Sequence, residues 1–227
     1  MLSAKYIDVH THQNHTTDQS IIAIQNAESS FISSISSSLY YSYGIHPWRI
    51  LDGHIDEKLN HLYTLASQNQ IVAIGECGLD KAIDTPFEVQ QQVFQQQINL
   101  SKTFKLPLII HCVRAYSEIL ALRKKFPEGC WIIHGFEGNE TLAKQLISKN
   151  MHLSIGSALF NPKSKISRSI EHISILRLFF ETDDRNIYSI QEIYEQASKL
   201  LGLNSDDLKV QIFRNFVACF QMQINDP

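Results

Sequence analysis

The chain has 227 residues, of which 44% are hydrophobic, and this is enough apolar material for one domain with a sizeable core. Its 20 basic and 23 acidic residues give a net charge of −3, which excludes the broad basic surface of a protein that coats long nucleic acid. The N-terminus lacks the apolar region of a secretory leader, and no apolar run is long enough to cross a bilayer. We therefore expect a single domain over residues 1–227 that is monomeric and does not bind membranes.

The cysteines are Cys77, Cys112, Cys130 and Cys219, and they lie far apart in the sequence without a CxxC motif. In a chain of this length, such spacing favours reduced thiols over a disulfide framework. The cysteines therefore indicate a cytoplasmic protein.

The first third of the chain alternates short apolar runs with polar segments. A strand is predicted over residues 6–12, a short helix over 21–27, a second strand over 31–35 and a third over 39–45. Only residues 36–38 separate the last two strands, whereas a parallel crossover needs about a dozen residues. Either one outer helix is missing in this region or the second strand is wrong.

From residue 56 onward, helices and strands alternate regularly. Helices are predicted over residues 56–68, from the capping box Thr85-Pro86-Phe87-Glu88 to Phe104, over 117–126 and 139–150, from the capping box Ser189-Ile190-Gln191-Glu192 to Gly202, and from about Ser205 to Phe220. Strands are predicted over 71–75, 107–110, 131–133, 151–155 and 177–182. About eight strands alternating with helices predict an α/β fold, a (β/α)8 TIM-type barrel shortened in the first third. An open doubly wound sheet is the alternative, although its glycine-rich phosphate loops are absent.

Side chains that bind metals gather at the predicted strand ends. His10 and His12 are two residues apart on a strand, so their side chains point the same way. A single histidine in such a place is more often a structural residue, but here several strands end in the same way, and the C-terminal rim of a barrel is where its chemistry lies. Two carboxylates and four imidazoles suit two divalent metals with open positions for water; the six residues are His10, His12, Glu76, His111, His134 and Asp183.

Taken together, these stretches resemble the TatD family of metal-dependent deoxyribonucleases, which belongs to the amidohydrolase-type barrels. The likeness covers nearly the whole chain in the right order. The residues that carry it are Asp8-Val9-His10-Thr11-His12, Gly44-Ile45-His46-Pro47, Ile74-Gly75-Glu76-Cys77-Gly78-Leu79-Asp80, Pro86-Phe87-Glu88-Val89-Gln90-Gln91-Gln92-Val93-Phe94, Leu106-Pro107-Leu108-Ile109-Ile110-His111, Ile133-His134-Gly135-Phe136 and Glu181-Thr182-Asp183.

The resemblance implies a phosphodiesterase, a TatD-type deoxyribonuclease that acts on DNA ends or on a small phosphodiester. One metal would be held by His10, His12 and Asp183 and the other by His111 and His134, with Glu76 bridging the two. Asp183 would also be the general base. The two divalent ions, such as Zn, Mg or Mn, would activate the attacking water. A metal-dependent amidohydrolase or lactonase with a small-molecule substrate is the alternative, because the same ligands would serve it.

Several residues depart from the family pattern around the expected substrate mouth. Lys81 replaces a common aromatic residue, and Glu137 replaces the usual serine after Phe136. Because a carboxylate at Glu137 would repel a polyanion, Arg114 and Arg185 are candidate phosphate contacts that could offset it. His46 also ends a strand, and we favour a second-layer or substrate-facing role over metal ligation for it.

Overall fold

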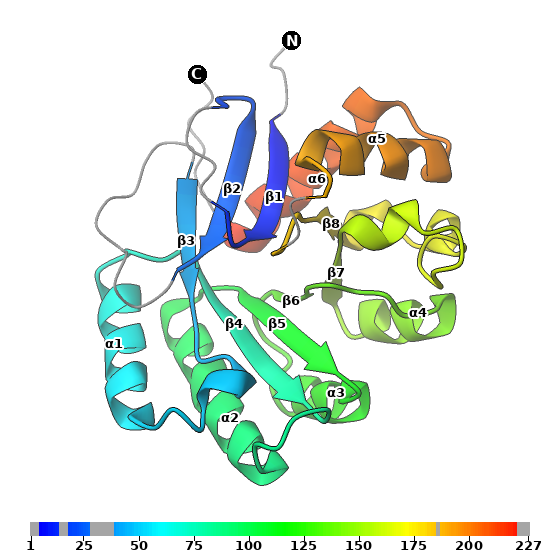
Figure 1. Cartoon of the computed structure of the whole chain (residues 1–227). Helices are drawn as coiled ribbons and strands as arrows, with labels where there is room; N and C mark the ends of the chain where they lie inside the picture. Colours follow the sequence, from blue (N-terminus) through cyan, green and yellow to red (C-terminus); the bar gives the residue numbers. More distant parts are fainter. Residues whose placement is uncertain (1–4, 14–17, 28–38, 185–186, 222–227) are drawn as a thin grey trace.

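The computed structural model describes residues 5–13, 18–27, 39–184 and 187–221. Eight strands form one sheet in which every neighbouring pair is parallel and the order follows the sequence (Figure 1). The strands are β1 (Tyr6–Thr11), β2 (Ile21–Asn26), β3 (Leu39–Tyr43), β4 (Ala73–Asp80), β5 (Leu108–Val113), β6 (Trp131–Ile133), β7 (Met151–Ile155) and β8 (Leu178–Phe180). The predicted (β/α)8 barrel is confirmed.

The first and last strands come together just beyond the end of β8. Asp183 bridges Thr11 in parallel, its backbone N–H donates to the carbonyl of His10 at 3.0 Å, and its carbonyl accepts from His12 N–H at 3.1 Å. Next to this bridge, the buried Asp8 carboxylate accepts from both the N–H and the hydroxyl of Thr182, at 3.0 and 2.7 Å. These bonds bring the end of β1 beside the segment that follows β8, and that is where several predicted ligands lie.

Helices cover the outside of the sheet (Figure 1). The α-helices are α1 (Ile55–Ser67), α2 (Phe87–Phe104), α3 (Tyr116–Lys125), α4 (Glu140–Ser148), α5 (Ile190–Leu201) and α6 (Ser205–Phe220), and short 3-10 turns occur at η1 (Pro47–Arg49), η2 (Ser157–Phe160), η3 (Ile170–His172) and η4 (Ile175–Arg177). Of the helices in the described ranges, none is long and apolar enough to span a bilayer.

The predicted helix over residues 21–27 is wrong, because this segment is strand β2. Its run Ile21–Ile24 is buried throughout, as expected of a strand covered on both faces, and a short apolar run of this kind does not distinguish a strand from a buried helix. The strand predicted over 31–35 falls outside the described residues. The short connection is therefore the one between β1 and β2, residues 12–20, whose described part contains no helix.

Two strand ends and one helix cap also differ from expectation. Strands β4 and β5 continue past Glu76 and His111, so these two side chains lie within strands rather than at their ends. The capping box at Ser189 is confirmed by reciprocal bonds with Glu192. The box at Thr85 is wrong, because that hydroxyl donates to the carbonyl of Pro47 at 3.3 Å and helix α2 has no side-chain cap.

The prediction of four reduced cysteines is also wrong. Cys130, just before β6, and Cys219, near the end of α6, form a disulfide with their Cα atoms 5.6 Å apart. They are 89 residues apart in the sequence, and sequence distance does not limit proximity once the barrel has folded. Cys77 and Cys112 are free. The cysteines therefore no longer support the predicted location in the cytoplasm.

Candidate metal centre and active site

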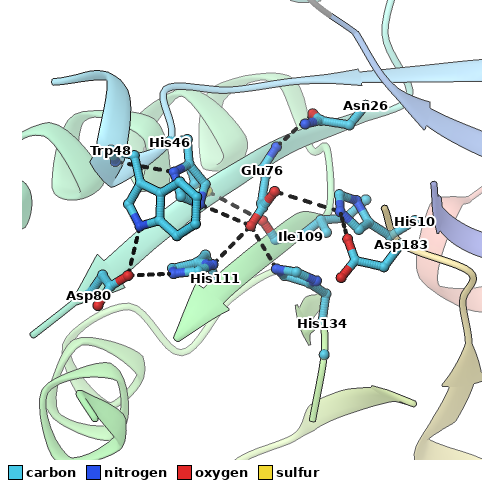
Figure 2. A network of polar contacts seen from close by, with 12 residues as sticks. His10, Asn26, His46, Trp48, Glu76, Asp80, Ile109, His111, His134 and Asp183 are labelled. Atoms are coloured by element: carbon cyan, nitrogen blue, oxygen red, sulfur yellow. Dashed lines mark hydrogen bonds and ion pairs between the residues drawn. The ribbon is translucent and has the colours of Figure 1, made fainter. Parts of the chain in front are cut away.

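Glu76 lies at the middle of a polar cluster at the C-terminal side of the barrel (Figure 2). Its Oε1 atom is 2.9 Å from Nδ1 of His111, 2.7 Å from Nε2 of His134 and 3.1 Å from Nε2 of His46. These imidazoles come from β5, from the residue after β6 and from the segment after β3. One carboxylate oxygen thus gathers three side chains from three places in the barrel.

The other oxygen of Glu76 faces His10 on β1 and His12 just after it. Oε2 is 3.6 Å from Nε2 of His10 and 3.7 Å from Nε2 of His12. The same two nitrogens are 3.4 and 3.7 Å from Oδ1 of Asp183. The two rings meet edge to face with their centroids 5.1 Å apart. The structure therefore brings together all six side chains that the sequence predicted to form the site.

Backbone packing explains how Glu76 reaches this position. The preceding Gly75 has a φ of 158°, and a Cβ there would lie 2.5 Å from the carbonyl oxygen of Ile109 on β5. Only glycine permits this approach of the two strands. On the other side, the N–H of Glu76 donates to Oδ1 of Asn26 at the end of β2 at 3.0 Å. The neighbouring strands thus fix the backbone that carries the central carboxylate.

The cluster is strongly coupled electrostatically. Burial by itself would raise the pKa of Glu76, but His134, His111 and His12 hold it well below its usual value. Burial would also raise the pKa of Asp183, and His10 keeps it lowered. Burial would lower the pKa of His134, yet Glu76 and Glu181 raise it well above its usual value. The carboxylates of Glu76 and Asp183 are therefore ionised near neutral pH.

The donor atoms suit divalent cations. His10 is fully buried, and neither of its ring nitrogens has a hydrogen-bond partner among the described residues. A buried nitrogen without a partner is costly, and a metal ion would satisfy it. Ligand atoms within 4.8 Å of one another occur in the groups His10–His12–Glu76, His10–His134–Asp183 and His46–Glu76–His111. Imidazole nitrogens mixed with carboxylate oxygens are typical ligands of Zn²⁺, Mn²⁺ and related ions.

The hydrogen bonds of His46 differ from those of the other imidazoles. Its Nδ1 atom accepts the backbone N–H of Trp48 at 3.1 Å, so in the neutral ring the proton is on Nε2. Burial lowers the pKa of His46 and favours that neutral form. The Nε2–H group then donates to Glu76. This geometry supports the second-layer role that the sequence favoured for His46.

Two further carboxylates lie behind the histidines. Nε2 of His111 is 3.1 Å from Oδ2 of Asp80, which also accepts the indole N–H of Trp48 at 2.8 Å. Nδ1 of His134 is 3.6 Å from Oε1 of the buried Glu181. Each ring thus turns one nitrogen toward Glu76 and the other toward an outer carboxylate, the arrangement that orients imidazoles in metal sites.

The sequence argument did not assign roles to these outer carboxylates. Glu76, Gly78 and Asp80 alternate along β4, and Glu181 precedes Asp183 by two residues. Counting in steps of two from each predicted ligand would have found both.

A cavity of about 440 Å³ opens above the cluster. Its lining includes Glu76, His111, His12 and Asp183 from the cluster and also Trp48, Arg49 and Lys58; the remaining lining residues are Asn26, Ala27, Tyr43, Gly44, Ile45, His46 and Asp184. The cations in this lining, Arg49 and Lys58, were not predicted from the sequence.

The cations that were predicted to contact phosphate lie elsewhere or cannot be placed. Arg114 is exposed after β5 and is not part of the lining of this cavity as far as the structure describes it. Arg185 falls outside the described residues. Lys81 pairs with Glu118 at 2.5 Å, and Glu137 lines a second hollow, beside Gly156, which shares Asp183 with the cavity above the cluster.

Comparison with known proteins points to one family. The family model of TatD related DNase matches residues 16–221. An uncharacterized metal-dependent hydrolase, YabD of Bacillus subtilis, is 34% identical over 151 residues, which cover 64% of this chain and 58% of YabD. The 3′-5′ ssDNA/RNA exonuclease TatD of Cronobacter turicensis is 34% identical over 152 residues, covering 62% and 55%. These matches span less than two thirds of either relative.

Solved structures share the fold. The TatD homologue YjjV of Escherichia coli superposes with a TM-score of 0.81 at 22% identity, covering 97% of this chain and all of that one. A TatD family hydrolase of Entamoeba histolytica gives a TM-score of 0.74 at 17% identity, covering 96% and 99%. With the family model matched over most of its length and the barrel and its motifs in place, this chain belongs to the TatD family.

Proposed function

We propose that this protein is a metal-dependent phosphodiesterase that removes nucleotides from the 3′ end of single-stranded DNA or RNA. The observation that carries this proposal is the gathering of four imidazoles and Asp183 around Glu76, with no hydrogen-bond partner among the described residues for either ring nitrogen of buried His10. The exonuclease name of a relative at 34% identity supports the substrate class.

The proposed assignment divides the site into two halves. His10, His12 and Asp183 would hold one divalent ion, His111 and His134 the other, and Glu76 would be shared between them. The two oxygens of Glu76 already face these two groups separately, which suits a bridging carboxylate. When bound, ions of this kind lower the pKa of water and offset the charge on phosphoryl oxygens.

Asp183 is the proposed general base. Its side chain is 32% exposed and lines the cavity, and its lowered pKa keeps it able to accept a proton at neutral pH. As a water oxygen bonds to phosphorus, one of its two protons moves to the Asp183 carboxylate. The bond from phosphorus to the leaving sugar oxygen breaks, that oxygen takes the electron pair and a proton from solvent, and Asp183 then releases its proton. His10 faces the same carboxylate at 3.4 Å and fixes its position. His46 donates to Glu76 and holds that carboxylate in place.

Two further proposals concern the whole chain. Residues 1–227 act as one hydrolase domain, because the site draws ligands from β1 to the segment after β8 and no part of the barrel can be separated from it. The cytoplasm is the proposed location, since TatD-type exonucleases act on nucleic acid.

A nuclease assay with a substrate panel tests the proposed function. A 3′-labelled single strand, its 5′-labelled counterpart and a panel of lactones and amides are incubated with the protein after chelation and again after Mg²⁺, Mn²⁺ or Zn²⁺ is restored. We expect stepwise shortening from the 3′ end that requires the added metal. Hydrolysis of only the lactones or amides would instead identify an amidohydrolase or lactonase.

A further inference from the structure

Trp48 is unusual in being both exposed and fixed. Its side chain is 61% exposed, yet its indole N–H donates to Asp80 at 2.8 Å and its backbone N–H donates to His46 at 3.1 Å. Its ring meets the rings of His46 and His111 edge to face, with centroids 5.0 and 6.1 Å away. A large apolar surface is thus held rigidly beside the polar cluster (Figure 2).

Packing against the core does not explain why a tryptophan occupies this exposed position. The ring covers little of the core, and the hydrogen bond to Asp80 together with the short turn η1 sets its orientation. A fixed aromatic ring loses little conformational freedom when a flat ligand stacks on it, and nucleic-acid bases are such ligands. Because the indole adjoins the cavity above Glu76, a base stacked there would belong to a nucleotide bound at the active site.

Two positively charged side chains, Arg49 and Lys58, line the same cavity as this ring. Arg49 follows Trp48 directly and makes an exposed ion pair with Asp52 at 3.0 Å, a kind of contact that a phosphate can replace at little cost. Lys58, on α1, donates to the carbonyl of Arg49 at 2.8 Å. The carboxylates Glu76 and Asp183 line the same cavity. The cavity thus offers cations to the phosphates of a polyanion as well as the candidate metal site.

We propose that Trp48 is a stacking platform for the 3′-terminal base of the substrate and that Arg49 and Lys58 bind the phosphate of the adjoining nucleotide. This inference rests on the proposed function, because it assigns the bases and phosphates of a single strand to named positions around the same site. Stacking of this kind accepts every base, so it predicts an enzyme with weak sequence preference.

Fluorescence provides a test that does not need turnover. The chain has two tryptophans, and Trp131 is buried in the core, so an added ligand reaches only Trp48. A single strand with phosphorothioate linkages at its 3′ end should quench the emission of the wild-type protein. The same strand should leave the emission of Trp48→Phe unchanged. An oligonucleotide with an abasic 3′-terminal nucleotide should bind without quenching.

Kinetics then separate stacking from an indirect effect through Asp80. For a normal single strand, Trp48→Ala should lower kcat/KM by about 5- to 100-fold, mainly through KM, and Trp48→Phe should recover most of that loss. For the abasic strand, Trp48→Ala should have much less effect. Arg49→Ala combined with Lys58→Ala should raise KM for both strands. Leu51→Ala, an equally exposed residue outside the cavity lining, is the control.

The outcomes distinguish the two proposals. Equal losses on normal and abasic strands, or quenching by both, would overturn the stacking platform and leave the nuclease standing. Quenching by the normal strand only, without metal-dependent cleavage, would keep the platform and overturn the proposed activity. Tight binding of peptides or proteins at Trp48, Arg49 and Lys58, with neither quenching by nucleic acid nor its cleavage, would overturn both proposals.

Discussion

His111 and Asp80 meet through the ring nitrogen that faces away from the candidate metal site. The Nε2 atom of His111 lies 3.1 Å from Oδ2 of Asp80, while its Nδ1 atom lies 2.9 Å from Glu76. Both carboxylates can only accept hydrogen bonds, so they compete for the ring proton of His111. A cation bound to the Nδ1 lone pair would leave that proton on Nε2, facing Asp80, and we infer that Asp80 stabilises the ring form that can bind metal.

Replacing the outer carboxylate with an amide, Asp80→Asn, should weaken the metal centre. The amide of this variant could present its NH2 group to Nε2 of His111, which would favour a proton on Nδ1 and remove the metal-binding lone pair. We expect metal affinity and kcat/KM to fall about 10- to 100-fold each. Calorimetric titration with Mn²⁺ and exonuclease assays measure the two effects. Asp84→Asn, an exposed carboxylate in the loop after β4, is the matched control and should change neither.

Removing one imidazole should lower metal content without unfolding the barrel. The His12 side chain is 39% exposed, so His12→Ala leaves no buried cavity. We expect the protein to retain fewer metal ions by elemental analysis and to lose at least about 100-fold in kcat, with a nearly unchanged melting temperature. The double change His10→Ala and His12→Ala should abolish hydrolysis. His54→Ala, an exposed histidine on the loop before α1, is the control, and wild-type turnover in His12→Ala would refute the assignment.

The disulfide should stabilise the fold without contributing to catalysis. It ties the segment before β6 to the end of α6, whereas His134 lies at the opposite end of β6. Because the bond closes a loop of 89 residues, its removal should cost about 2–4 kcal/mol of unfolding free energy. Cys219→Ser should therefore show a lower urea midpoint than the oxidised wild type, and reductant should lower the wild type to the same value. The oxidised wild type and Cys219→Ser should have the same kcat. A large loss of kcat in the variant would mean that the disulfide helps to hold the active site in shape.

His152 should make stability depend on pH. Burial lowers its pKa to about 4, and the guanidinium groups of Arg177 and Arg123 act in the same direction. In the unfolded chain its pKa is near 6.5. Between these pH values the unfolded state binds more protons at His152 than the folded state does. The contribution of His152 to stability is therefore fully present above about pH 6.5 and is lost as the pH falls toward about 4.

The variant His152→Gln isolates the contribution of His152 to stability. From about pH 7.5 to about pH 5 the His152 contribution should amount to about 2 kcal/mol. Urea unfolding of the wild type and His152→Gln at both pH values measures it as a difference of differences. The variant should lose less stability on acidification than the wild type. Equal losses of stability in the two proteins would mean that His152 has the same pKa in the folded and the unfolded state.

The sequence alone determined the barrel and the candidate residues of its site, and the tertiary structure decided how these residues are arranged. Metal-binding residue types recur near the C-terminal ends of the predicted strands, and this local pattern allowed His10, His12, Glu76, His111 and His134 to be found by reading the chain. Residues 21–26 could not be assigned correctly, because a short apolar run is compatible with either a strand or a buried helix until its neighbours cover it.

The contacts between distant segments could not be read from the chain. The pairing of Cys130 with Cys219, the approach of Asp80 to His111 and the placing of Trp48 and Arg49 in one cavity with Glu76 all depend on how strands and loops meet in space. Local sequence sets the direction of a side chain along its own strand, whereas the neighbours it meets are set by closure of the whole sheet. For that reason the sequence identified the side chains that we propose bind metal, and only the folded barrel revealed the carboxylates that face them and the cavity where we propose that a substrate binds.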